Sequence, residues 1–381
     1  MWAGRLIAVA AMLMMFGLSA SWTHAQAAPA GPAAPSAPSA GSSGSTGGNV
    51  LSLDMGKPNQ VIGDEITPPQ AAAVTRGLEV LAKQQAANGS WGTAGGEGSP
   101  TAVTALSAIA LMADGNLPGR GKYGSNVRKA VEFICNSSQE SGLLTGSDNT
   151  GEMYSHGFAT LFLGEVYGMT ANDEVKEKLQ KAVKLIEKAQ NPQGGWRYTP
   201  APVDADISVT ICQVMALRSA RDAGIKVQKD TIDKAINYVK QCQNPDGGFN
   251  YQLGMGSGSG FARTAAGTAA LYYAGVFQDD SIQRGLKYLM GRLPAAGNQQ
   301  MAEGNWYYGQ YYAVQAMFLA GGDYWGKWYP AIRETLIAKQ DKNTGLWSGE
   351  VDPDYCTAIA LIILQMPDRY LPVFNGKGPG S

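Results

Sequence analysis

The sequence predicts an all-α protein built as an α6/α6 toroid, in which six helical hairpins form two concentric rings. Three observations lead to this prediction. A glycine-containing turn that ends in an aromatic or apolar residue recurs along the chain with a period near 50 residues. A charged amphipathic segment precedes the turn, and a far more apolar segment follows it. No β-rich segment competes with this helical pattern.

The turn is clearest in two nearly identical stretches, QNPQGGWRY at 190–198 and QNPDGGFNY at 243–251. A proline stops the helix before each turn, and the glycine pair supplies positive φ at little cost. The glutamine amide can satisfy carbonyl groups left free at the helix end. We therefore interpret the turn as a joint between helices. The six copies end at Trp91, Leu144, Trp196, Phe249, Trp306 (a weaker copy) and Trp347, which are 53, 52, 53, 57 and 41 residues apart.

The helices on the two sides of the joint differ in character. Amphipathic helices with mixed charge are predicted before it, at 126–135, 176–189 and 229–241. Helices that are apolar nearly all round are predicted after it, at 101–113, 156–167, 208–220, 264–274 and 357–365. A helix of the second kind must be buried, so we expect it in the inner ring. An open solenoid is the alternative, but it usually needs polar terminal repeats, and the last copy here is as apolar as the others.

The beginning of the chain predicts export. Arg5 precedes the 15-residue apolar run 6–20, and Ala25-Gln26-Ala27 has the form of a cleavage site. A membrane span needs roughly 20 apolar residues, so an uncleaved anchor is the weaker alternative. We expect a signal peptide at 1–27, a disordered linker rich in Ala, Pro, Gly and Ser at 28–66, the toroid at 67–374 and a tail at 375–381. The expected location is periplasmic or otherwise outside the cytoplasm, without a stable membrane span after cleavage.

The net charge and the cysteine spacing indicate which partners and metal sites are not expected. A formal net charge of −1 gives no general attraction for nucleic acid or anionic membranes, so neither partner is expected. The spacing of the four cysteines matches no zinc pattern of the Cys-x-x-Cys type. Buried free thiols are the expected state, and a Cys212–Cys242 disulfide is the alternative that an exported protein allows.

The repeated Gln-x-x-x-Gly-x-Trp/Phe joint resembles the QW-type repeat of squalene and oxidosqualene cyclases, shared in looser form with protein prenyltransferase β subunits. The resemblance covers about residues 68–373. YSHGFATLFLGEVYG at 154–168 and YLPVF at 370–374 further resemble exported bacterial proteins with prenyltransferase and squalene-oxidase repeats. The resemblance implies an α/α toroid, whereas activity must be argued from the site.

Two incomplete motifs of this family are present. The cyclases protonate an alkene with Asp-x-Asp-Asp at the start of an inner helix; Asp204 and Asp206 match the first two acids, and Ile207 replaces the third. These two are the candidate catalytic residues, and an ordinary helix cap is the alternative for Asp206. The prenyltransferases bind zinc through Asp-x-Cys and a distant His, which Asp354, Cys356 and His156 match only in part. No metal site is favoured, and no cofactor is expected.

Other residues are expected to face the central cavity of the ring. His156 lies at the head of an inner helix, Arg263 opposes the acids there, and four tyrosines follow one another closely at Tyr307, Tyr308, Tyr311 and Tyr312. Aromatic faces can hold an apolar ligand, or they can equally fill the core. Further acids at the heads of inner helices, which are Glu97, Glu152, Glu303, Glu350 and Asp352, leave a glycoside hydrolase or polysaccharide lyase open.

The sequence thus favours a binding or scaffold module. Its cavity would take a small apolar or isoprenoid-like ligand, or a peptide of a partner protein. The alternative is an enzyme of the terpene cyclase or prenyltransferase type acting through inner-helix acids.

Overall fold

The fold was analysed in a computed structural model, which describes residues 61, 63–92, 100–146, 151–294, 304–349 and 351–374. These residues belong to one compact unit, Leu53–Ser381. The predicted signal peptide and tail, and nearly all of the predicted linker, lie outside the described residues. The described part of the chain contains twelve α-helices and only isolated β-bridges, which confirms the all-α prediction.

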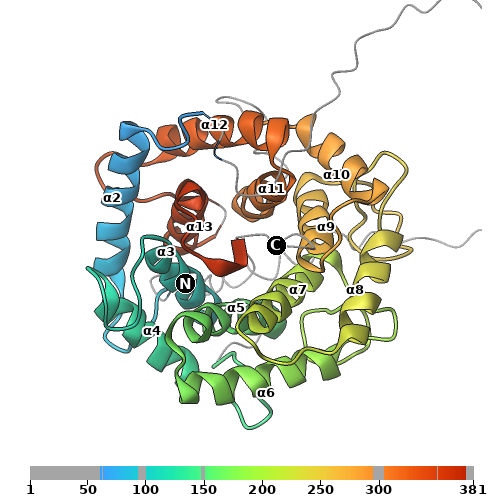
Figure 1. Cartoon of the computed structure of the whole chain (residues 1–381), viewed down its shortest axis with the longest axis horizontal. Coiled ribbons are helices and arrows are strands. Elements are labelled where there is room, and N and C mark those ends of the chain that lie inside the picture. The colour runs from blue at the N-terminus through green and yellow to red at the C-terminus, as the bar shows by residue number, and fades with distance from the viewer. Residues whose placement is uncertain are drawn as a thin grey trace, which may run out of the picture. The chain divides into compact units, whose positions relative to one another are not determined.

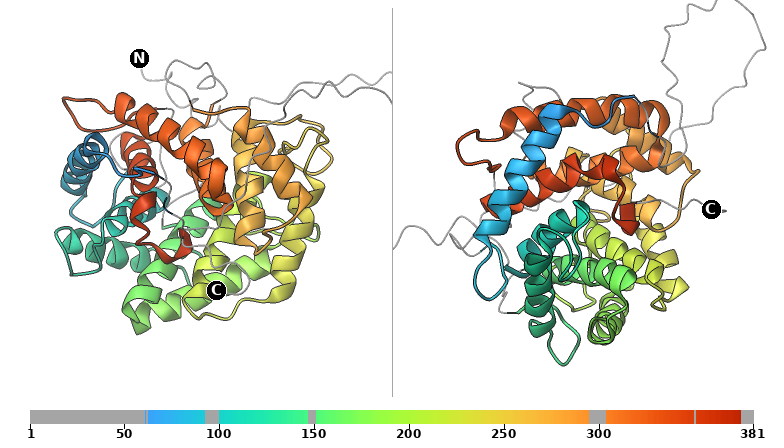
Figure 2. Two further views of the ribbon diagram at one scale, coloured as in Figure 1. Left: turned by 45° about the horizontal axis from the view of Figure 1, so that its top comes forward. Right: turned by 60° about the vertical axis from the view of Figure 1, so that its left-hand side comes forward.

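The helices alternate between two concentric rings, as predicted (Figure 1). Helices of one hairpin run side by side, and the views in Figure 2 show the same two layers from other directions. The outer ring consists of α2 (Pro68–Gln84), α4 (Gly124–Asn136), α6 (Asp173–Ala189), α8 (Lys229–Gln241), α10 (Asp280–Met290) and α12 (Gly322–Lys339). The inner ring consists of α3 (Pro100–Ala113), α5 (Glu152–Thr170), α7 (Ile207–Asp222), α9 (Phe261–Tyr273), α11 (Trp306–Ala320) and α13 (Pro353–Leu364).

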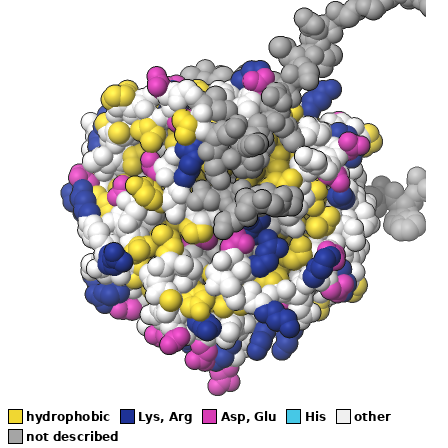
Figure 3. All heavy atoms as spheres, in the orientation of Figure 1, with side chains coloured by type: hydrophobic (Ala, Val, Ile, Leu, Met, Phe, Trp, Pro, Cys, Tyr) yellow, Lys and Arg dark blue, Asp and Glu magenta, His cyan; other side chains and the backbone are white. Residues whose placement is uncertain are grey.

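Composition explains which ring each helix joins. Every residue of α3 from 101 to 113 is buried, whereas α6 buries mainly the face that carries Val175, Leu179, Val183 and Ile186. The outer faces carry charges of both signs, which lie around the rim in the space-filling view (Figure 3). Burial of apolar surface contributes roughly 25 cal/mol per Å², so the inner helices supply most of the driving force for folding.

Small residues let the inner helices approach one another closely. A Cβ atom added at Gly157 of α5 would lie 2.9 Å from the Cβ of Cys212 on α7. One added at Gly164, two turns further along α5, would overlap Ser219 of the same neighbour. The sequence pattern of small residues in the inner helices is therefore a packing requirement.

The joint connects three helices rather than two. The side-chain amide of Gln190 donates to the carbonyl of Gly194 in its own turn, at 2.9 Å, and to that of Thr231 in the next outer helix, at 2.8 Å. Three other joints repeat the second bond, with Gln85 to Asn126, Gln243 to Ser281 and Gln340 to Ala73. Since Gln340 follows α12 and Ala73 lies in α2, this last bond closes the ring.

The glycine and the tryptophan of the joint have separate roles. Gly194 has a φ of 101°, and a Cβ atom there would overlap the backbone of Lys234 in α8. Trp196 is buried and donates its indole N–H to the carbonyl of Ile186 at 2.7 Å. Trp306 differs, because it is the first residue of α11; part of this weaker copy, 301–303, lies outside the described residues.

The glycine of the joint can be tested with one matched pair of substitutions. Gly194→Ala adds both a disfavoured φ and an overlap with α8, and it should lower the free energy of unfolding by about 3 kcal/mol. Gly224 has a φ of 86° but open space around its Cβ position. Gly224→Ala should therefore cost only about 1 kcal/mol. Urea unfolding of the two variants measures the difference, and equal losses would contradict the proposed contact.

Candidate functional site

The heads of the inner helices meet at one end of the ring, and Asp206 lies buried among them. It is the N-cap of α7, and its Oδ1 accepts a hydrogen bond from the backbone N–H of Val209 at 2.9 Å. Its own backbone N–H donates to the carbonyl of Trp196 at 2.9 Å, which ties the joint to the helix head. The helix-cap alternative is therefore the role that the structure gives this residue.

Arg197 brings the two candidate acids together. Its Nε lies 3.4 Å from Oδ2 of Asp206, and its Nη1 donates to the half-exposed carboxylate of Asp204. The guanidinium lies over the rings of Tyr198 and Tyr251, at 4.9 and 5.8 Å from their centroids. Burial raises the pKa of Asp206 to about 7, although the N–H of Val209 and the charge of Arg197 act in the opposite direction.

Four partly exposed tyrosines lie near this group, and a fifth, Tyr355, lies near Tyr308. We call these five the tyrosine collar: Tyr154, Tyr198, Tyr251, Tyr308 and Tyr355. Three lie in the first turns of α5, α11 and α13, and the other two follow joints.

The collar residues are close neighbours. The rings of Tyr154 and Tyr198 are 6.0 Å apart, and the hydroxyls of Tyr198 and Tyr251 contact each other. Tyr308 donates to the carbonyl of Ser208 at 2.8 Å. Burial raises the pKa of Tyr308, and the nearby Asp206 and Tyr355 raise it further. The collar thus combines aromatic faces with hydroxyl groups around a buried ion pair.

Sequence reasoning missed Arg197 and all of the collar except Tyr308. A signal was present, because Tyr198 and Tyr251 each stand two residues after the aromatic residue of a joint. The other members give no such signal, since only folding brings the heads of different inner helices together.

Three of the predicted cavity tyrosines form core instead. Tyr307, Tyr311 and Tyr312 are at most 1% exposed. The rings of Tyr311 and Tyr312 contact each other edge to face, at 4.8 Å, and the Tyr312 hydroxyl lies 3.2 Å from the Sγ of Cys212. Their size fills the space between inner helices, which leaves Tyr308 as the one of the four that reaches the collar.

His156 forms hydrogen bonds within the fold, a role that its position in the sequence does not indicate. In four repeats, the backbone N–H of the aromatic residue that ends the joint donates to a threonine on the inner helix: Thr104, Thr210, Thr264 and Thr357. In the second repeat the N–H of Leu144 donates to Nδ1 of His156 at 3.1 Å. Nε2 of His156 lies 3.2 Å from the carbonyl of Ala182 in α6. With Nδ1 accepting, Nε2 carries the proton and donates to that carbonyl.

The environment of His156 keeps it neutral. The side chain is fully buried, and burial lowers its pKa to about 4. Both ring nitrogens are engaged between the two rings of helices, so the structure does not bring His156 to the collar or to a metal.

The remaining predicted residues are also engaged within the fold. Asp354 accepts a hydrogen bond from the N–H of Gly92 at 3.2 Å, and burial raises its pKa to about 6. The thiol of Cys356 is buried and donates to the carbonyl of Val351 at 3.7 Å. Arg263 donates to Ser257 at 3.3 Å. Among the residues that the structure describes, no three His, Cys, Asp or Glu side chains are grouped so that they could hold a metal.

Several other expectations have a plain outcome. All four cysteines are buried and free, so the Cys212–Cys242 disulfide is not formed. Of the further acids, Glu97, Glu303 and Glu350 lie outside the described residues. Within the described ranges, no helix has the length and hydropathy of a membrane span.

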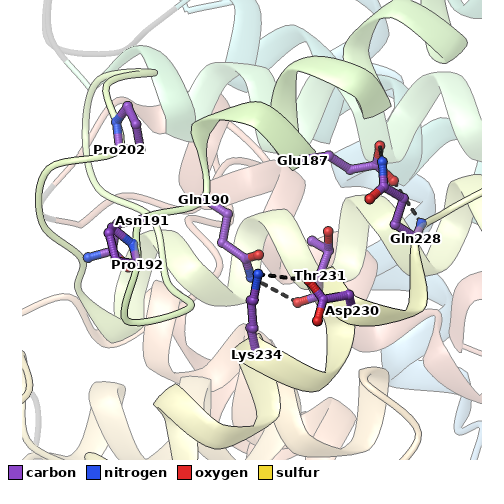
Figure 4. Close-up of a pocket in the computed structure, with 9 residues that line it drawn as sticks. All are labelled: Glu187, Gln190, Asn191, Pro192, Pro202, Gln228, Asp230, Thr231 and Lys234. Carbon is purple, nitrogen blue, oxygen red and sulfur yellow. Dashed lines mark hydrogen bonds and ion pairs between the residues drawn. The ribbon is translucent and has the colours of Figure 1, made fainter.

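A pocket of about 320 Å³ lies between the end of α6 and the start of α8, beside the joint that follows α6 (Figure 4). Its lining is mostly polar and is already paired: Glu187 accepts from Gln228, and Lys234 forms an ion pair with Asp230 at 2.7 Å. The collar has more groups suited to a ligand than this pocket does.

The fold and the repeated joint define an α/α toroid, and comparison with known proteins shows which family part of the chain is similar to. Residues 159–332 match the family of the squalene-hopene cyclase C-terminal domain. Over these residues, a little under half of the chain, the sequence is similar to that family, and the described residues have the toroid fold of solved type II terpene cyclases. No curated protein sequence matches the chain.

Solved structures share the fold at low sequence identity. The type II terpene cyclase MstE from Scytonema is 14% identical, with a TM-score of 0.56, covering 80% of this chain and 99% of that one. An inactive variant of the α-1,6-mannanase GH76A of Salegentibacter sp. HEL1_6 is 11% identical, with a TM-score of 0.58, covering 78% and 98%. A protein from Actinoplanes is 15% identical, with a TM-score of 0.54, covering 78% and 99%.

The neutral His156 predicts a loss of stability in acid. Its pKa is about 4 in the folded protein against an ordinary value of 6.5, so the unfolded chain binds the proton first as the pH falls. Between pH 7.5 and 4.5 this should cost about 2 kcal/mol of unfolding free energy. His156→Gln keeps a donor and an acceptor but does not titrate, and it should lose about that much less in urea unfolding. Parallel pH profiles would contradict this assignment.

Asp206 predicts the opposite pH dependence. Its folded pKa of about 7 lies above the ordinary 3.8, so its contribution is favourable at low pH and is lost as the pH rises through 7. Asp206→Asn keeps the helix cap. As the pH rises from 5 to 8, its free energy of unfolding should increase by about 2 kcal/mol relative to that of the wild type.

Asp279 provides the matched control, because it also caps a helix. Its hydrogen bond with Lys240 lowers its pKa to about 2. Asp279→Asn should therefore destabilise the protein equally at pH 5 and pH 8. The same behaviour of both variants would rule out the raised pKa of Asp206.

Proposed function

We propose that the protein is an exported binding module that holds a small apolar or isoprenoid-like ligand against the tyrosine collar. The observation that carries this proposal is the grouping of the partly exposed collar tyrosines at the Asp206–Arg197 pair, with four of them near the pair and Tyr355 near Tyr308. Their ring faces offer apolar surface to a ligand, and their hydroxyls can form hydrogen bonds with a polar end of the ligand.

The type of ligand is supported by a protein of the same fold. MstE has been solved in complex with its substrate geranylgeranyl dihydroxybenzoate, which joins an isoprenoid chain to a phenolic head. A ligand with an apolar chain and a hydroxylated end would suit the collar in the same way. The predicted signal peptide supports export, so we place the binding event outside the cytoplasm.

Binding of farnesol, measured by calorimetric titration of the chain without residues 1–27, tests the proposal. Tyr154→Ala and Tyr308→Ala should each raise the dissociation constant for farnesol about tenfold or more, which corresponds to a loss of about 1.4 kcal/mol of binding free energy. The control is Tyr370→Ala, which removes an exposed tyrosine that follows α13 and lies beside Gly115, just beyond the last turn of α3. It should leave the affinity unchanged.

Two results would refute the proposal. One is the absence of saturable farnesol binding by a folded protein. The other is an equal affinity of the collar variants and the Tyr370→Ala control. Mannotriose, the ligand seen in the mannanase structure, serves as the competing probe; saturable binding of mannotriose alone would assign the collar to sugars.

A second candidate function is acid catalysis by Asp206, supported by its burial and by its pKa near 7, which leaves a large part of this carboxyl protonated at neutral pH. The nearby Arg197 and the capping bond to Val209 favour the ionised form and use the carboxylate within the fold. For that reason binding is the preferred function. Cyclised products from geranylgeranyl dihydroxybenzoate that disappear in Asp206→Asn would favour catalysis instead.

A further inference from the structure

The last described residues, which end at Phe374, lie within the inner ring near the far ends of α5 and α7. After α13 the chain forms two short 3-10 turns, η2 (Met366–Asp368) and η3 (Pro372–Phe374). The second turn packs against α5 and α7, and Figure 1 shows it in red within the inner ring. Leu371, Val373 and Phe374 are at most 4% exposed. We call residues 371–374 the C-terminal plug.

One buried carboxyl group joins the plug to the ring. Oε2 of Glu165 on α5 accepts a hydrogen bond from the backbone N–H of Val373 at 3.2 Å. Its Oε1 accepts from the hydroxyl of Ser219 on α7 at 2.6 Å, and the residue is 2% exposed. Glu165 thus offers an acceptor to the 3-10 turn η3, which packs against α5 and α7.

The chain just before the plug is held separately. Arg369 forms an ion pair with Glu65 at 2.8 Å, and the amide of Gln365 donates to the carbonyl of Ala110 at 3.1 Å. Arg369 itself has a φ of 57°, a left-handed conformation that is unfavourable for a residue with a side chain. Between it and the plug, Tyr370 is 57% exposed. Residues 369–370 are therefore where we expect the chain to rotate if the plug leaves, because the chain before them is held by its own contacts.

We propose that the groove between α5 and α7 is a binding site for a short hydrophobic peptide of the Leu-Pro-Val-Phe type, and that the C-terminal plug is its exchangeable intramolecular occupant. The plug shows the chemistry that the groove accepts: three apolar side chains and one backbone N–H aimed at Glu165. This site lies at the opposite end of the inner helices from the tyrosine collar, so it does not depend on the function proposed for the collar.

The charges around Glu165 give the exchange a pH dependence. Burial raises its pKa to about 7, and Asp222 adds to the increase. Arg218 pairs with Asp222 at 2.5 Å, and Tyr273 and Tyr311, which also face Glu165, keep their protons because burial raises their pKa values. The closed state holds the proton of Glu165 more tightly than a solvated open state, so opening becomes more favourable as the pH rises through 7.

Peptide binding to a shortened chain tests the proposal directly. A chain that ends at Tyr370 should bind a fluorescent peptide with the sequence of residues 369–374 saturably, as measured by anisotropy. The same peptide with Ala in place of Phe374 should bind at least tenfold more weakly. The full chain should also bind at least tenfold more weakly, because its own plug occupies the groove. A folded shortened chain that ignores the peptide, or does not distinguish the two peptides, overturns the proposal.

Hydrogen exchange of the full chain keeps the proposal testable if the shortened chain does not fold. The amide of Val373 should exchange at least 100-fold faster than the amides of α13, through local opening. Corrected for intrinsic rates, its opening constant should rise about tenfold from pH 6 to pH 8, and Glu165→Gln should remove that rise. Exchange of Val373 together with α13 in one global event overturns the proposal. Farnesol binding is measured separately, so failure at the collar is distinguishable from failure here.

Discussion

The structure depends on the side-chain amide of one glutamine in four of the six joints, namely Gln85, Gln190, Gln243 and Gln340. That amide bonds a carbonyl of its own turn and a carbonyl of the next outer helix, so it fixes the angle between neighbouring hairpins. A chain of hairpins could otherwise extend as an open solenoid. The bond from Gln340 to Ala73 joins the last outer helix to the first, and it turns the repeat into a closed ring. Because two buried carbonyls share one amide, its loss would leave both unsatisfied.

The closed ring determines where the proposed ligand would be bound. The inner helices α5 and α7 approach closely at Gly157 and Gly164. Large side chains such as Tyr311 and Tyr312 of α11 are buried within the inner ring. The C-terminal plug, residues 371–374, occupies the far side of the inner ring, where Val373 bonds Glu165. Partly exposed groups with mixed aromatic and polar character therefore gather at the helix heads. A rigid scaffold that presents such groups at one end is a common arrangement for binding.

Irregular repeats show how the same position serves different chemistry. His156 replaces a threonine of the other repeats and accepts the same type of bond from the joint. Its second nitrogen bonds the outer helix α6, in a repeat where Leu144 stands in place of a tryptophan. In the first, third and sixth joints, the tryptophan indole bonds an outer-helix carbonyl instead. A lone histidine at a helix head thus belongs to the core, and only the comparison of repeats in three dimensions makes this evident.

The sequence by itself determined the fold of this protein, because hydrophobic periodicity and the repeated joint are local patterns that decide which helix is buried and where each one ends. It also placed Asp204 and Asp206 at a helix head, since spacing along one segment is enough for that. Only the tertiary structure decided which residues share a site. Tyr154, Tyr308 and Tyr355 come from three different inner helices, and Glu165 meets Val373 from a distant part of the chain. The distances between such residues depend on how closely the helices pack, which is set by side-chain volume across the whole ring rather than by any one segment.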